Sequence, residues 1–133
     1  ATVESVEKFW QSLGARTSLL SPKVHDLVVA RTSHLPHVLA TALVRCVLGG
    51  EEHGEADFCA TGFRDSTRLA DGAAPMWRDI ALANPKAIAA ALDDLQEELD
   101  GLRTALEVED AEALEQFFDE GRRLRSDWLK GRE

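Results

Sequence analysis

The chain has no tyrosine, and aromatic residues make up only 6% of its 133 positions. This composition disfavours strand-rich folds, which usually contain more aromatic and β-branched residues. Basic residues are also outnumbered, since 15 Lys and Arg stand against 24 Asp and Glu for a formal net charge of −9. We therefore expect no nucleic-acid partner, because phosphate backbones need clustered cations. No uninterrupted apolar run reaches about 18 residues, which predicts no membrane span.

Patterns for secretion, metal binding and nucleotide binding are missing as well. Cys46 and Cys59 form no CxxC pair and are predicted to be reduced thiols in the core of a cytoplasmic protein. The first residues lack the basic and apolar regions of a secretion signal. On a helix, His25 would lie about 180° from His34, and there is no HExxH motif, so we expect no metal site. The absence of a glycine-rich loop after a strand predicts that the chain binds no nucleotide by itself.

Apolar spacing predicts an all-α fold of about six helices, two of them long. An apolar share of 44% is enough for a folded core. No strand-like alternation or internal repeat is present. We expect a single domain over residues 1–133, with helices at 3–13, 23–48, 56–70, 75–83, 85–107 and 110–129.

The second of these helices contains a proline. Ser21 and Pro22 mark its start, as cap and first helical residue. The stretch 38–48 is hydrophobic nearly all round, which predicts a buried helix. Pro36 removes a backbone hydrogen bond and clashes with the preceding turn, so a kink or break is expected near residues 33–35.

The fifth helix carries a heptad seam. Its spacings are 4, 3, 4, 3 and 4, which is typical of packing against another helix. That partner is either another helix of the same chain or a second subunit. The seam residues are Ile88, Leu92, Leu95, Leu99, Leu102 and Leu106.

Two polar clusters are candidates for chemistry. Ser33, His34 and His37 interrupt the apolar helix beside Pro36. They either satisfy the kinked backbone or face a polar cavity, because buried polar groups need partners. His37 is the residue that we place on the cavity side.

The second cluster holds a pair of arginines. Arg64 and Arg68 are four residues apart, so a helix would put both on one face. Two guanidinium groups on one face suit a carboxylate or phosphate. The alternative is ordinary ion pairing with Asp65, with Asp71 or with the acidic helices of the chain. Trp77, in the short helix that follows, is by itself most simply a packing anchor.

Three motifs in order resemble one enzyme family. They are Ser33–His37 (SHLPH), Gly62–Ala70 (GFRDSTRLA) and Met76–Ile80 (MWRDI). Their combination closely resembles the C-terminal domain of prephenate dehydrogenases and the related arogenate dehydrogenases, over almost the whole chain. The resemblance implies a fold like the C-terminal domain of 6-phosphogluconate dehydrogenase, and a homodimer formed through this domain.

The resemblance also implies an activity. Such enzymes bind NAD or NADP in an N-terminal Rossmann domain, and prephenate or arogenate lies between the two domains. Prephenate is oxidatively decarboxylated to 4-hydroxyphenylpyruvate in tyrosine biosynthesis. No residue of this chain matches the family's catalytic histidine, so the chain alone is expected to be inactive. The alternative from the residues alone is a non-catalytic helical dimer that acts as a scaffold or ligand sensor.

By the same resemblance, several residues take roles in the pocket. Arg68 would hold a substrate carboxylate, His37 would meet the substrate side chain, and Trp77 would lie near the pocket. Asp65 would belong to a gating ion pair. The substrate-binding set is completed by Arg64, and the supporting set by His34 and Ser33. Thr61 stands where the family often has glycine, which leaves a backbone contact there in question.

Overall fold

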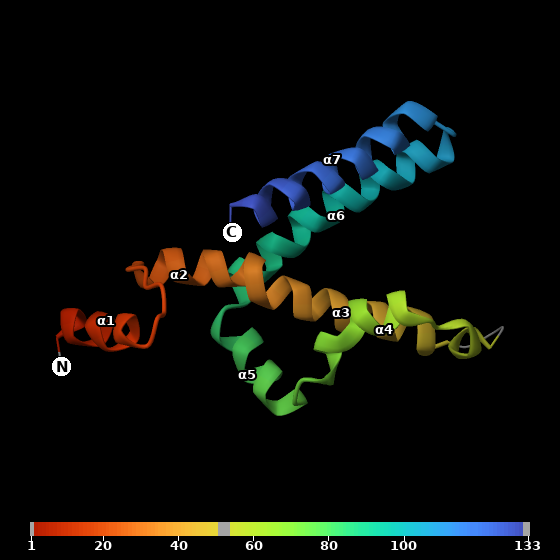
Figure 1. Cartoon of the computed structure of the whole chain (residues 1–133). Helices are drawn as coiled ribbons and strands as arrows, with labels where there is room; N and C mark the ends of the chain where they lie inside the picture. Colours follow the sequence, from red (N-terminus) through yellow and green to blue (C-terminus); the bar gives the residue numbers. More distant parts are fainter. Residues whose placement is uncertain (1, 51–53, 132–133) are drawn as a thin grey trace. The chain divides into compact units, whose positions relative to one another are not determined.

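The computed structural model describes residues 2–50 and 54–131, which contain helices and no strand (Figure 1). The all-α prediction is confirmed, with six helices in the described chain when Pro22–Leu48 is counted as one. Contacts divide the chain into two compact units, Ala1–Ile88 and Ala89–Glu133. The α-helices are α1 (Val3–Ser12), α2 (Pro22–Val29), α3 (Leu35–Leu48), α4 (Thr61–Thr67), α5 (Ala74–Ala83), α6 (Pro85–Glu107) and α7 (Ala111–Lys130).

The predicted helix ends are where the capping chemistry puts them. The Ser21 hydroxyl accepts a hydrogen bond from the Val24 amide at 3.3 Å, which starts α2. The Asp110 carboxylate accepts one from the Ala113 amide at 3.0 Å, which starts α7. Gly14, just after α1, has φ +81°, the left-handed conformation in which helices commonly end.

The break expected near Pro36 is confirmed and takes the form of a π-turn. Residues Ala30–His34 (η1) form a π-helix between α2 and α3. The Leu35 amide donates to the Ala30 carbonyl, five residues back rather than four. This wider turn accommodates Pro36, which has no amide hydrogen to donate. The helix therefore continues through the proline, and His34 and His37 fall directly around it.

The predicted helix over 56–70 is wrong as a single element. It is divided into a 3₁₀ turn η2 (Glu55–Phe58), α4, and a second 3₁₀ turn η3 (Arg68–Asp71). Cys59 and Ala60 have extended conformations, which separate η2 from α4. At the other end Thr67 leaves regular α geometry, with φ −104° and ψ −1°, and its hydroxyl donates to the Phe63 carbonyl at 2.7 Å.

In the first unit, α3 is the helix with the most neighbours. The turn η3 and helix α4 lie against α3, and Ala30, Ala40 and Ile88 are buried there. The Asn84 side-chain amide, at the junction of α5 and α6, donates to the Asp26 carbonyl of α2 at 2.8 Å. This bond ties together segments 58 residues apart in the chain.

The second unit is a pair of helices. Helices α6 and α7 lie side by side (Figure 1). Residues of both helices line a small hollow. Ala91 and Ala105 are its buried residues, at 1% and 8% exposure. Among the leucines of the seam, Leu95 and Leu102 are half-buried, whereas Leu92, Leu99 and Leu106 are 37%, 45% and 57% exposed. The exposed leucines recur every seven residues and form a stripe that α7 does not cover.

Two burial predictions are wrong for the described chain. Helix α3 was expected to be buried, yet Leu39 and Leu48 are 46% and 37% exposed. Cys46 is exposed and Cys59 half-buried, so neither is a core thiol. The reason is that η3, α4 and η2 cover only part of α3.

One described helix is long and apolar enough to cross a membrane, contrary to the expectation from its interrupted apolar runs. It is Pro22–Leu48, 27 residues in length with a mean hydropathy of 1.3 in its most apolar window. The criterion is length and composition alone, and a core helix of a soluble protein meets it too.

Candidate functional site

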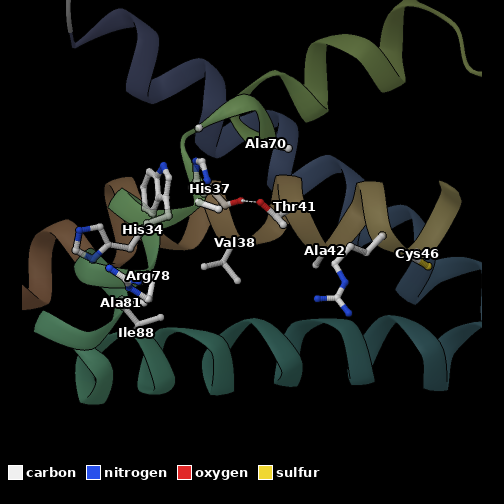
Figure 2. Close-up of a pocket in the computed structure, with 14 residues that line it drawn as sticks. His34, His37, Val38, Thr41, Ala42, Cys46, Ala70, Arg78, Ala81 and Ile88 are labelled. Carbon is white, nitrogen blue, oxygen red and sulfur yellow. Dashed lines mark hydrogen bonds between the residues drawn. The ribbon is translucent and has the colours of Figure 1, made fainter. Parts of the chain in front are cut away.

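A large open groove lies over α3 in the first unit and is here called the His37 groove (Figure 2). Its volume is about 990 Å³. One wall is α3, which Figure 2 shows carrying His37, Thr41 and Cys46 in succession. The opposite wall comes from the end of η3, from α5 and from the first turn of α6. Its lining residues are His34, His37, Val38, Thr41, Ala42, Arg45, Cys46, Ala70, Gly72, Ala74, Trp77, Arg78, Ala81 and Ile88.

A stacked pair of rings forms one end of the groove. The His37 imidazole lies on the Trp77 indole with ring centroids 3.4 Å apart and planes 11° from parallel. His34 approaches the same indole edge-on, with centroids 6.2 Å apart and planes at 86°. The π-turn and the following turn of α3 bring both histidines to one aromatic side chain. The rings fix each other's orientation, because stacked and edge-on contacts are favourable only in narrow geometries.

Burial controls the charge of His37. The side chain is only 8% exposed, and this desolvation lowers the pKa of His37 below its usual value of 6.5. His37 is therefore neutral at pH 7 and can both donate and accept a hydrogen bond. The nearby Nδ1 atom of His34 is buried and has no hydrogen-bond partner among the described residues.

We expect this burial to appear as a pH dependence of stability. The pKa of His37 is depressed in the folded state and ordinary in the unfolded state, so the unfolded chain binds more protons below about pH 6.5. The free energy of unfolding should be highest above that pH, and it should decrease as the pH drops through the pKa that His37 has in the folded state. Urea denaturation of the chain between pH 8 and pH 5 measures the slope. The variant His37→Gln should flatten it, and parallel curves for the two proteins would contradict the prediction.

The charges on the groove walls are of one sign. Arg45 and Arg78 line it, and the described lining contains no aspartate or glutamate. Arg78 pairs with Asp79 at 2.8 Å, so part of its charge is compensated. No ion-pair partner of Arg45 is found in residues 2–50 and 54–131. In a chain of net charge −9, this local cationic lining favours an anionic ligand.

The structure brings together some of the predicted site residues and not others. His34, His37 and Trp77 meet in the groove. Arg64 and Arg68 are exposed and do not line it, and Arg64 lies 3.7 Å from the Asp65 carboxylate. The two arginines also belong to different secondary-structure elements, because Arg64 is on α4 and Arg68 begins η3.

Arg68 is nevertheless close in sequence to a residue that lines the groove. It is two residues before Ala70, which lines the groove, and both residues belong to η3. Asp65 is exposed on α4, and Ser33 is exposed on the π-turn. Neither of these two lines the groove.

Sequence reasoning missed three groups that the groove uses. Thr41 and Arg45 follow His37 at intervals of four, which places all three along one side of α3. That spacing is visible in the sequence. Gly72 gives no such signal, because its contact with the groove depends on how η3 is placed against α3.

Metal and dinucleotide sites can be tested on the described residues. In the part of the chain that the structure describes, no three His, Cys, Asp or Glu side chains gather as metal ligands. The described residues also lack a strand and therefore the strand–turn–helix that cradles a pyrophosphate. The described residues therefore do not form the pyrophosphate cradle of a Rossmann domain.

Comparisons with known proteins agree on one family. The family model described as prephenate dehydrogenase, dimerization domain, matches residues 21–120, which include parts of both units. A cyclohexadienyl dehydrogenase of Zymomonas mobilis is 37% identical over 123 residues, covering 90% of this chain and 42% of the relative. A prephenate dehydrogenase of Bacillus subtilis is 38% identical over 122 residues, covering 87% of this chain and 32% of the relative. The chain thus spans well under half the length of these relatives.

Solved structures show the same fold. The prephenate dehydrogenase of A. aeolicus, in complex with hydroxyphenyl propionate and NAD+, has a TM-score of 0.86 and 31% identity. The match covers 94% of this chain and 44% of that one. A Synechocystis arogenate dehydrogenase has a TM-score of 0.84 and 25% identity, with coverage of 95% and 47%.

Proposed function

The chain belongs to the prephenate dehydrogenase family, whose dimerization domain it matches, and from this premise we propose that it forms the subunit interface and part of the substrate pocket of such an enzyme. The complete enzyme would oxidatively decarboxylate prephenate to 4-hydroxyphenylpyruvate, as a step of tyrosine biosynthesis. Both units would act as one domain, and the protein would be a cytoplasmic homodimer. The nicotinamide cofactor, which accepts the hydride, would be held by a separate Rossmann domain.

The observation that carries this proposal is the His37 groove. It joins a neutral stacked histidine to a cationic lining without a carboxylate. Prephenate is a dicarboxylate with a cyclic hydroxyl, so it presents anionic and hydrogen-bonding groups to such a lining. Arogenate carries an ammonium group, for which the described lining offers no counter-ion. The groove therefore supports prephenate as the preferred substrate.

The residues of this chain would bind and orient the substrate. Arg68, on η3, would hold a carboxylate, and Arg64 would add to the positive field while Asp65 forms its gating ion pair. His37 would hydrogen-bond the substrate side chain, with its ring held by Trp77. Ser33 and His34 would support this end of the pocket. Holding a substrate in a productive pose is a large catalytic contribution in itself.

The test is turnover by the protein in which this chain is joined to its nucleotide-binding domain. We expect reduction of NAD or NADP with prephenate, formation of 4-hydroxyphenylpyruvate, and weaker activity with arogenate. The chain alone should show no turnover. A complete protein that is dimeric but inactive with both substrates would overturn the proposal and favour the alternative of a scaffold or ligand-sensing dimer.

A further inference from the structure

The loop between η3 and α5 approaches the two stacked rings closely. A Cβ atom built on Gly72 would lie 2.6 Å from Cε1 of His37 and 2.7 Å from Cδ1 of Trp77, and closer still to the indole Nε1. Carbon atoms in proteins pack at about 3.5–4.0 Å. Position 72 therefore has no room for any side chain while the stack is in place.

The backbone of Gly72 does not itself require glycine. Its φ and ψ are −63° and 143°, an extended conformation that any residue adopts. The need is for space and not for conformational freedom. This distinguishes Gly72 from Gly14 and Gly54, whose positive φ values favour glycine but which have open space or only a distant contact around them.

The clash could not be relieved cheaply. Both neighbours are rigid aromatic rings, and His37 is buried on α3. Trp77 is held between the imidazole and the edge of His34. The loop itself is short, because η3 ends at Asp71 and α5 begins at Ala74. A methyl group at position 72 must either separate the rings or push the loop away from the groove.

We infer that Gly72 is a positioning residue of the substrate pocket, whose missing side chain allows the His37 imidazole to lie stacked on Trp77 in the groove. The arrangement of the two rings follows from the structure alone, whereas its effect on substrate binding rests on the proposed function. Gly72→Ala should therefore disturb the ring geometry first and substrate binding as a consequence.

The experiment uses the complete enzyme with histidine labelled at Cε1. The NMR signal of the His37 Cε1 proton, assigned by its loss in His37→Asn, should be shifted upfield in the wild type by the indole ring current. In Gly72→Ala that upfield displacement should shrink by at least half. The KM for prephenate should rise about tenfold or more, because displacements near 1 Å in a pocket have effects of this order. The kcat should change much less than KM, since the rings contribute to binding.

Two further variants make the result specific. Gly50→Ala is the matched control, because Gly50 also has ordinary φ and nothing lies within 4 Å of its built Cβ. It should change neither the signal nor KM. Trp77→Phe removes the indole Nε1, the atom nearest to the new methyl group, so adding Gly72→Ala to this background should raise KM less than it does in the wild type. The same background provides a folded protein if Gly72→Ala alone fails to fold.

Each outcome decides between the two claims. A folded Gly72→Ala variant with unchanged signal and unchanged KM would overturn the inference, as would a changed signal with unchanged KM. A wild-type enzyme with no activity on prephenate would defeat the proposed function. The NMR signal would then still show whether Gly72 positions His37.

Discussion

Replacing Leu92 and Leu99 by glutamate should convert a dimer into a monomer at micromolar concentration. Both leucines are exposed on α6, at 37% and 45%, on the stripe that α7 leaves uncovered. Burying a leucine contributes roughly 1.5–3 kcal/mol. In a two-fold interface each substitution occurs twice. The dissociation constant should therefore rise by roughly 10⁴-fold or more, before any cost of burying the new charges.

Sedimentation equilibrium of the purified chain measures this directly. The control is Val108→Glu, which places the same charge at an exposed apolar residue of the second unit, at 68% exposure, off the leucine stripe. Val108→Glu should leave the protein dimeric. Circular dichroism should show equal helicity in all three proteins, because the replaced side chains lie on the surface. A wild-type chain that sediments as a monomer would refute the predicted interface.

The helices were predictable because their signals are local. Ser21 and Asp110 cap, Gly14 terminates, and apolar residues recur at helical spacing, so each boundary depends on residues within one or two turns. Pro36 likewise located the break in the second helix. The form of that break was not predictable, because an extra residue in the turn depends on how α2 and α3 pack on their neighbours.

The segment before Gly72 shows where local signals fail. Residues 56–70 have the composition of one helix, but the structure has two 3₁₀ turns around α4. The helix is interrupted by extended backbone at Cys59 and Ala60, and it ends at Thr67, whose hydroxyl bonds a backbone carbonyl. Each of these features reflects only a small local preference. Packing of η3 against α3 decides between them and a continuous helix.

The candidate site was predictable in part for the same reason. The motif SHLPH contains His34 and His37, which the sequence identifies as polar residues in an apolar helix. Their contacts with Trp77 are a result of the tertiary fold. The stacking itself joins residues 40 positions apart, so no spacing within one helix could reveal it. Burial predictions failed for α3 and Cys46 because sequence hydrophobicity does not say whether a face is covered by the same chain or by another.

Arg68→Ala in the complete enzyme should raise the KM for prephenate by about 10- to 150-fold while kcat changes little. A charge-assisted bond from guanidinium to carboxylate is worth roughly 1.5–3 kcal/mol, which is this range of affinity. Arg64→Ala should have a smaller effect, because the Asp65 carboxylate 3.7 Å away already offsets part of its charge. Arg68→Lys should fall between wild type and Arg68→Ala, since a lysine keeps the charge and loses the two-pronged geometry.

Steady-state kinetics with prephenate at saturating cofactor separates these cases. Arg122→Ala is the matched control: Arg122 is an exposed arginine of α7 that pairs with Asp119, and its loss should leave KM within about twofold of the wild type. Added salt should raise the wild-type KM and have less effect on Arg68→Ala, because the attraction being screened is the one that the variant lacks. An unchanged KM in Arg68→Ala would show that Arg68 does not bind the substrate, and would leave the substrate carboxylates to Arg45 and Arg78, whose side chains line the His37 groove.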